Sequence, residues 1–171
     1  MKALLIIANE GYQDQEYEVT RKTLEKAGVN IVTAAKTAGK CRGKFGATAI
    51  ASISIDDLDV SDYDAIIFIG GPGAVSYQQD VQAHLTAQEA TTQDKILAAI
   101  CIAPTILAEA GVLEGKKATV WNNDGKPAKI LTKNGATFTN VAITVDGKII
   151  TANGPEAAAE FGRKIVEMLG L

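Results

Sequence analysis

Short apolar runs alternate with amphipathic segments along most of the chain. The apolar runs have the length of buried strands, and they lie at residues 3–8, 29–34, 64–69 and 96–100. Amphipathic or helix-forming segments follow them, at residues 16–27, 79–92 and 105–110. This alternation predicts an α/β fold with a mostly parallel sheet.

The first predicted helix has clear boundaries. Tyr17, Thr20, Leu24 and Ala27 recur at the spacing of one helical face, and Gly28 supplies a stop signal. On these residues alone, an acidic side chain near the helix start complements the helix dipole.

Two regions depart from the strand-helix alternation. Residues 36–50 are rich in Lys, Gly and Thr and contain the turn Gly43-Lys44-Phe45-Gly46, which favours a small hairpin. After residue 111 the pattern loosens, and a polar turn occupies residues 122–125.

The C-terminal part predicts a hairpin and a final helix. Strands near 141–145 and 148–152 flank Asp146-Gly147, which is a strong hairpin signal. The last helix begins around Gly154-Pro155-Glu156, with an apolar face formed by Ala158, Phe161, Ile165 and Met168. Glu160 and Lys164 are expected to pair on its exposed face.

Composition narrows the classes of function. The 171 residues, 47% of them hydrophobic, suit one domain spanning residues 1–171. A net charge of −3 without a Lys or Arg cluster removes the usual basis for binding nucleic acid or acidic membranes. The first apolar run is also far shorter than the ~20 residues of a membrane span. The expected partner is a small molecule or another copy of the chain.

Two cysteines and one histidine limit the chemistry. Cys41 and Cys101 form no disulfide framework and have no metal-ligand spacing, so we expect a cytoplasmic protein without a metal or other cofactor. Cys41, set between Lys and Arg, is expected on an exposed hairpin. His84 lies in a polar helical segment, and we expect it to be solvated and without a catalytic role.

Cys101 occupies the most informative position. The run 96–100 ends at this thiol, and a helix-forming segment follows almost at once, so a sharp strand-to-helix turn would present the sulfur. The nearby helix N-terminus would lower the pKa of the thiol. The alternative interpretation is a buried cysteine that only fills space.

Loops at the carboxyl ends of the strands are expected to meet around Cys101. They span residues 9–16, 70–73 and 101–104. The backbone N–H groups of Gly71 and Ile102 are candidates for stabilising an oxyanion. The Gly70-Gly71-Pro72-Gly73 loop lacks the spacing of a phosphate-binding or dinucleotide-binding loop.

These motifs together resemble the ThiJ/PfpI superfamily, which includes the Parkinson-associated deglycase and archaeal intracellular peptidases. The resemblance extends over essentially the whole chain, through residues 4–10, 64–73, 98–104 and 107–113. It implies a flavodoxin-like three-layer sandwich, usually homodimeric, in which the cysteine of the strand-to-helix elbow is nucleophilic or redox-active.

The resemblance also assigns roles to residues of this chain. Cys101 is the elbow cysteine, and Glu16, twelve residues before Gly28, is the acid that contacts its thiolate. A buried Glu16 would stay protonated, donate a hydrogen bond and lower the pKa of the thiol. Gly70, Trp121 and Asn122 are expected to line the pocket.

The sequence departs from the family at its histidines. Peptidase-like members have histidine directly after the cysteine, where this chain has Ile102, and the position of their intersubunit acid holds Val75. Deglycase-like members have a later histidine, where this chain has Trp121 and Asn122. Peptide hydrolysis needs proton delivery to a poor leaving group, so peptidase activity is the least favoured enzymatic hypothesis.

Three hypotheses follow. In the first, Cys101 adds to a 2-oxoaldehyde and Glu16 moves the proton, as in a glutathione-independent glyoxalase or deglycase, with a role in carbonyl or oxidative stress. In the second, Cys101 is an oxidisable sensor without catalytic activity. In the third, the elbow is inactive and an altered, apolar pocket binds a ligand or partner.

Overall fold

The computed structural model describes residues 1–171 and contains a central seven-stranded sheet. Its strand order is β11-β12-β8-β7-β1-β3-β6. All neighbours are parallel except β11 and β12. The strands are β1 (Lys2–Ile6), β3 (Asn30–Ala35), β6 (Ile53–Ser54), β7 (Ala65–Phe68), β8 (Ile96–Ile100), β11 (Ile143–Asp146) and β12 (Ile149–Ala152).

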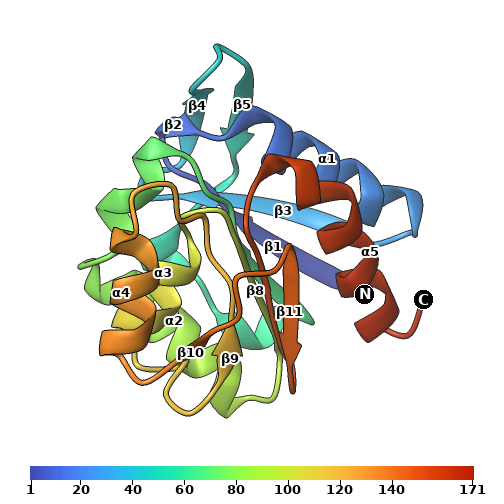
Figure 1. Cartoon of the computed structure of the whole chain (residues 1–171). Helices are drawn as coiled ribbons and strands as arrows, with labels where there is room; N and C mark the ends of the chain where they lie inside the picture. Colours follow the sequence, from blue (N-terminus) through green and yellow to red (C-terminus); the bar gives the residue numbers. More distant parts are fainter.

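Two smaller sheets flank the central one. The first has the order β2-β4-β5 and consists of β2 (Glu10–Tyr12), β4 (Gly39–Gly43) and β5 (Thr48–Ala51). The second pairs β9 (Lys117–Ala118) with β10 (Thr137–Phe138). The β4–β5 hairpin projects from the body of the molecule (Figure 1).

Helices cover both faces of the central sheet. In Figure 1, α1 (Asp14–Lys26) and α5 (Ala158–Met168) lie together on one side. The other side carries α2 (Val81–Thr92), α3 (Pro104–Glu109) and α4 (Lys126–Lys133). The predicted flavodoxin-like three-layer arrangement is confirmed.

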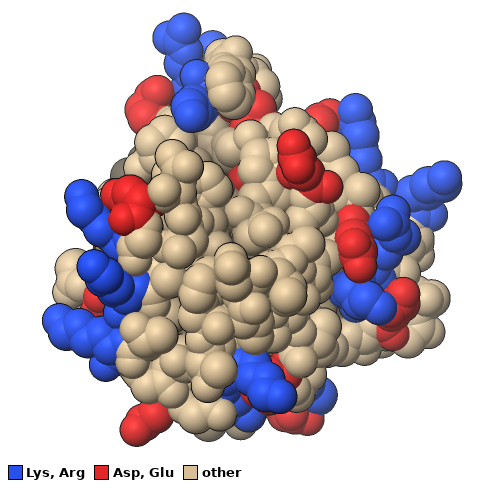
Figure 2. All heavy atoms as spheres, viewed as in Figure 1, with Lys and Arg blue, Asp and Glu red and all other residues tan.

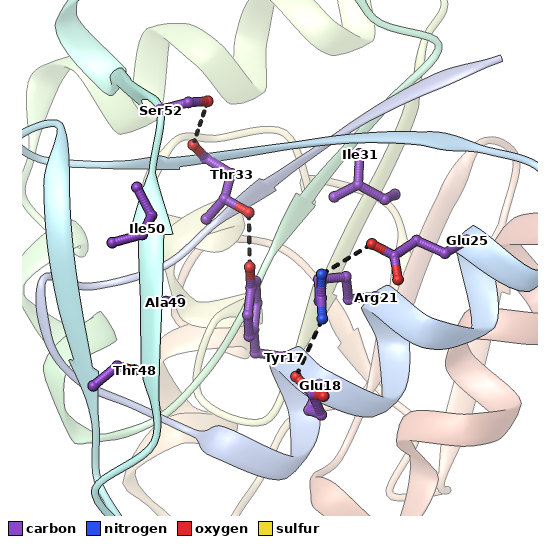
Figure 3. Close-up of a pocket in the computed structure, with 10 residues that line it drawn as sticks. All are labelled: Tyr17, Glu18, Arg21, Glu25, Ile31, Thr33, Thr48, Ala49, Ile50 and Ser52. Carbon is purple, nitrogen blue, oxygen red and sulfur yellow. Dashed lines mark hydrogen bonds and ion pairs between the residues drawn. The ribbon is translucent and has the colours of Figure 1, made fainter.

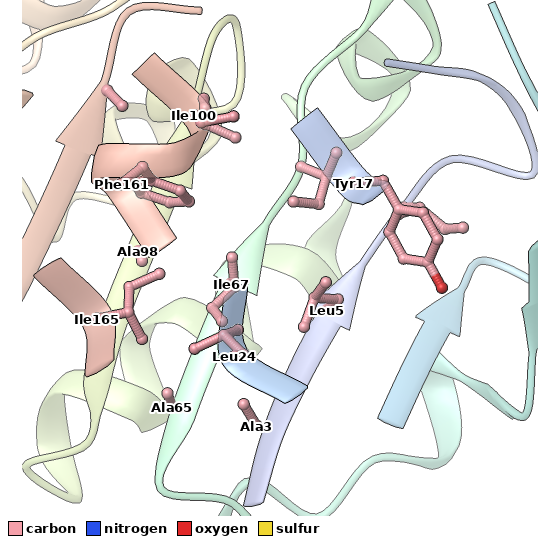
Figure 4. Packing of buried hydrophobic residues seen from close by; sticks show 14 of the residues in the cluster. Ala3, Leu5, Tyr17, Leu24, Ala65, Ile67, Ala98, Ile100, Phe161 and Ile165 are labelled. Carbon is pink, nitrogen blue, oxygen red and sulfur yellow. The ribbon is translucent and has the colours of Figure 1, made fainter. Parts of the chain in front are cut away.

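The central strands are apolar throughout because both of their faces are buried. In β1, Ala3 and Leu5 belong to the core under α1 and α5, whereas Leu4 and Ile6 belong to the core under the other helices. Figure 4 shows the first of these cores, in which Phe161 of α5 lies among side chains of the sheet. A continuous apolar run therefore becomes two hydrophobic cores.

The predicted elements agree with the structure except at a few positions. The hairpins at 39–51 and 143–152 are present, and Gly147 has the positive φ of 59° that a tight turn requires. Sequence patterning missed α4, which begins after a polar turn at Gly125. The expected Glu160–Lys164 pair is wrong, because the Lys164 ammonium donates to Glu167 at 2.8 Å.

Gly162 allows α5 to approach α1 closely. A Cβ atom at this position would lie 2.8 Å from Cβ of Thr23 and 2.9 Å from its Cγ2. We expect Gly162→Val to lower the free energy of unfolding by about 2 kcal/mol through overpacking. Urea unfolding measures this change, with Ala159→Val on the exposed face of the same helix as the control. Equal effects of the two substitutions would contradict close packing as the cause.

Charges of both signs are distributed around the rim of the face shown in Figure 2, and no field of a single sign covers it. No helix of the protein combines the length and apolar character required to cross a membrane. No group of three or more His, Cys, Asp or Glu side chains lies close enough to hold a metal ion.

Candidate active site

Cys101 lies in the tight turn that joins β8 to α3. Its φ of +64° falls in the left-handed region, which costs a non-glycine residue about 1 kcal/mol or more. The turn is held on both sides, because the Cys101 N–H donates to Ala152 O at 2.9 Å and its carbonyl accepts from Trp121 N at 2.8 Å. Pro104 then begins α3, where its missing N–H has little cost. The predicted elbow is therefore present.

Glu16 lies in the first turns of α1 and is fully buried, with 0% exposure. The helix begins two residues earlier than predicted, at Asp14, so Glu16 points into the protein and is not a solvated partner of the helix dipole. Its Oε2 accepts from Gly70 N at 3.0 Å, while Oε1 is buried without a partner of hydrogen-bond geometry. The carboxyl and the Cys101 thiol are near enough to shift each other's pKa.

Burial controls protonation of this pair. Loss of solvation raises the pKa of Glu16 to about 7, although its contacts with Cys101 and Gly70 oppose the rise. Burial, followed by the charge and hydrogen bonding of Glu16, raises the pKa of Cys101 to about 12. We expected the thiol pKa to be lowered beside a protonated Glu16 and a helix N-terminus, but burial raises it, because loss of solvation outweighs the backbone donors. Both groups therefore hold their protons more tightly than they would in water.

Two backbone donors converge on the sulfur. The N–H groups of Gly71 and Ile102 both lie near the Cys101 sulfur and oppose the rise in its pKa. Gly71 has a φ of +105°, which glycine adopts readily. These are the two N–H groups that the sequence proposed as oxyanion donors, and the structure places both of them beside the Cys101 sulfur.

Gly70 leaves the space in which the Glu16 carboxyl and the Cys101 side chain meet. A Cβ atom there would lie 2.6 Å from Cys101 Cβ and 2.7 Å from Glu16 Oε2. Only glycine leaves room for these two side chains to meet. Gly70 was expected to line the pocket, but it is buried behind this contact and is not among the lining residues.

A cavity of about 400 Å³ opens in front of Cys101. Trp121 lines it as predicted from sequence, and Ile102 and Val75 lie where the family's peptidase-like members have polar groups. The full lining consists of Gln13, Lys44, Phe45, Gly71, Pro72, Val75, Cys101, Ile102, Trp121 and Pro155. Most of this surface is apolar, and it contains no histidine.

Several predicted positions differ from their expected environments. Asn122 is not a lining residue, because its Oδ1 accepts from Ala128 N at 3.0 Å within α4. Cys41 is fully buried, with 0% exposure, and not on an exposed hairpin face, so burial raises its pKa. His84 is half-buried, and its Nε2 contacts Gln78 O at 2.7 Å.

Sequence reasoning missed Gln13, Lys44, Phe45 and Pro155 as lining residues. The glycines around Lys44-Phe45 signalled a turn, but nothing in the sequence showed where this turn would dock. The Gln13 side chain accepts from Glu16 N at 2.8 Å and caps α1.

A second cavity, of about 530 Å³, lies between α1 and strands β3 and β5 (Figure 3). Tyr17 donates to or accepts from Thr33 Oγ1 at 2.8 Å, and Arg21 pairs with both Glu18 and Glu25. Its cation is thus already neutralised, and no cysteine or histidine lines the cavity. The Cys101 cavity is the better candidate for an active site.

Comparison with known proteins agrees with the fold. The sequence profile of the DJ-1/PfpI family matches residues 1–168, and the chain belongs to this family. It is 32% identical over 169 residues to protein MJ0967 of Methanocaldococcus jannaschii, an alignment covering 98% of this chain and 82% of the relative. That relative is described only as an uncharacterized protein.

Solved structures show the same architecture. A ThiJ/PfpI domain protein from Brachyspira murdochii superposes with a TM-score of 0.95 at 27% identity, covering 99% of this chain and 96% of the other. Toxoplasma gondii DJ-1 in an oxidized form superposes with a TM-score of 0.85 at 27% identity, covering 98% and 90%.

Proposed function

We propose that this DJ-1/PfpI family member converts 2-oxoaldehydes into 2-hydroxy acids without glutathione, with Cys101 as nucleophile and Glu16 as acid-base group. The observation that carries the proposal is the juxtaposition of a buried carboxyl and a thiol at the floor of an open cavity. A glyoxalase or deglycase activity of this kind would contribute to defence against carbonyl stress.

The first step forms a hemithioacetal. The Cys101 sulfur attacks the aldehyde carbon and its proton passes to ionised Glu16, which then delivers that proton to the former carbonyl oxygen, so that a hydroxyl forms and Glu16 is ionised again. With Glu16 as the base, sulfur attack and thiol deprotonation are concerted. The reaction therefore proceeds without a stable thiolate, although the pKa of the thiol is high. In this proposal the N–H groups of Gly71 and Ile102, which act on the Cys101 sulfur, also donate to the oxyanion that develops beside it.

The second step moves a proton between two carbons. Glu16 removes the proton from the former aldehyde carbon and returns it to the neighbouring carbon. The proton of the new hydroxyl moves to the former ketone oxygen, and the product is a thioester of the 2-hydroxy acid. Water then hydrolyses the thioester, releases the acid and restores the thiol. No external oxidant, reductant or cofactor is needed for this sequence.

The missing histidine disfavours peptide hydrolysis more than aldehyde addition. No histidine lies in the cavity to protonate an amine leaving group, and Ile102 and Val75 are apolar. Addition to an aldehyde expels no leaving group, and one carboxyl can serve both proton transfers. Peptidase activity therefore remains the least favoured enzymatic function.

A direct test follows the product. The purified protein, free of glutathione, should convert methylglyoxal to lactate, measured with an enantioselective lactate assay. Failure to form the 2-hydroxy acid from both methylglyoxal and phenylglyoxal at pH 8, where Glu16 is largely ionised, would reject the proposal. The variants that assign the chemistry to residues are considered in the Discussion.

A second candidate function is oxidant sensing, which is favoured by the backbone donors around the sulfur and by the oxidized form of the T. gondii relative. Cys101 is 9% exposed beside an open cavity, whereas Cys41 is 0% exposed. Limiting peroxide should therefore place oxygen on Cys101 well before Cys41, as read by peptide mass spectrometry. Equal oxidation of both cysteines would count against a sensor.

The cellular setting and the oligomer are also proposals. Both cysteines are free thiols, which suits a reducing cytoplasm. A homodimer is proposed from the family resemblance. The small-molecule partner is the carbonyl substrate, or an oxidant in the second candidate function.

A further inference from the structure

The mouth of the Cys101 cavity carries an unpaired cation. Lys44 is the only charged residue among those lining the cavity, and it takes part in no ion pair. Its ammonium lies 5.2 Å from the ring centroid of Phe45, so it remains close to an apolar wall. No carboxylate of the lining competes for it.

The hairpin tip that carries Lys44 is fixed in place by α1. Asp14 accepts from Phe45 N at 2.9 Å and from Ala47 N at 2.8 Å, one oxygen for each donor. Lys44 N donates to Tyr12 O at 2.8 Å. These bonds join the tip to α1, the helix that carries Glu16, so the backbone of Lys44 has a defined position beside the cavity.

The remaining walls suit a larger apolar group than a methyl. Phe45 is 73% exposed and Trp121 is 42% exposed, and both line the cavity although they come from distant parts of the chain. Four aliphatic or proline side chains complete the apolar lining: Pro72, Val75, Ile102 and Pro155. Methylglyoxal, with three carbons, would occupy only a small part of about 400 Å³.

We propose that the cavity recognises an anionic, aromatic-sized molecule, whose apolar body packs against Phe45 and Trp121 and whose carboxylate pairs with Lys44. This inference deepens the proposed function, because it makes the substrate an aryl or bulky 2-oxoaldehyde that bears a carboxylate. Only the aldehyde group of that substrate rests on the proposed function. Lys44 then determines substrate specificity and takes no part in the chemical step.

The test separates recognition from turnover. Phenylacetate and its neutral counterpart phenylacetamide, neither of which is an aldehyde, are titrated into the protein at low salt. Calorimetry gives the affinity, and fluorescence of Trp121, the only tryptophan, reports occupation of this cavity. Phenylacetate should bind about tenfold more tightly than phenylacetamide, as expected for a charge-assisted contact in a partly desolvated site.

Two variants assign the preference to one side chain. Lys44→Gln should bring the two affinities to within about twofold of each other, whereas Lys40→Gln should leave the preference intact. Lys40 is a matched control, since it is exposed on β4 of the same hairpin and does not line the cavity. Equal binding of both ligands by the unmodified protein, binding of neither, or a preference that survives Lys44→Gln would overturn the proposal.

Failure of the proposed function has a different signature. If phenylacetate shows the Lys44-dependent preference but neither phenylglyoxal nor 4-carboxyphenylglyoxal is converted to its 2-hydroxy acid, the recognition stands and the glyoxalase chemistry is rejected. If both are converted with the same kcat/KM, and Lys44→Gln changes neither, the chemistry stands and the recognition is rejected.

Discussion

Cys101→Ser is expected to reduce lactate formation from methylglyoxal by at least about 10³-fold, because a hydroxyl is a far weaker nucleophile than a thiol assisted by a base. Glu16→Gln should reduce kcat/KM by about 10²–10⁴-fold, the usual contribution of a general base. Both variants are assayed without glutathione, and their fold is verified by circular dichroism.

The pH profile distinguishes a base from a merely structural carboxyl. Because the pKa of Glu16 is raised to about 7, kcat/KM of the unmodified enzyme should rise with pH up to a plateau above about 7. The residual activity of Glu16→Gln should lack this inflection. Cys41→Ala should keep both the rate and the profile, since Cys41 does not line the cavity. Full activity in Cys101→Ser or in Glu16→Gln would refute the mechanism.

Glu16→Gln should make the protein more stable at alkaline pH. The pKa of Glu16 rises from 4.5 to about 7 on burial, so folding favours its protonated form. The contribution of Glu16 protonation to the free energy of unfolding is complete below about pH 4.5 and is lost as the pH rises through about 7. At 1.36 kcal/mol per unit of pKa, the loss amounts to about 3 kcal/mol. Glutamine stays neutral and avoids it.

Urea unfolding at several pH values measures this effect. The stability of Glu16→Gln relative to the unmodified protein should increase by about 3 kcal/mol between pH 4.5 and pH 8. Glu160→Gln is the control, because Glu160 is exposed on α5 and should give no comparable change. A difference that is independent of pH would show that Glu16 is not destabilised by its charge in the folded protein. If the expected result is obtained, Glu16→Gln gains stability at alkaline pH and loses catalytic activity.

Much of the fold and part of the site follow from local sequence. The apolar run before Cys101 and the Pro104 after it define a strand, a turn and a helix start, and each depends on neighbouring residues only. The alternation of such units then predicts the parallel sheet. Glu16 is different, because spacing alone assigns it to the helix dipole, and only the family resemblance placed it beside the thiol.

The predictions for Asn122 and Cys41 were wrong because contacts with other parts of the chain determine the surroundings of these residues. Asn122 is an ordinary polar residue in sequence, and the formation of α4, which patterning missed, gives it a capping role. Cys41 has charged neighbours along the chain, yet the alternation of β4 turns it inward, so it is fully buried. The cations beside it in sequence therefore do not determine its environment.

The sequence by itself determined the α/β class with a mostly parallel sheet and the strand-to-helix turn that presents Cys101, because apolar periodicity and turn residues act over short distances. Only the tertiary structure decided where the proton resides, since the pKa values of Glu16 and Cys101 depend on burial by segments far apart in the chain. It also decided that Lys44 reaches the cavity, through the hydrogen bonds of a hairpin tip to Asp14.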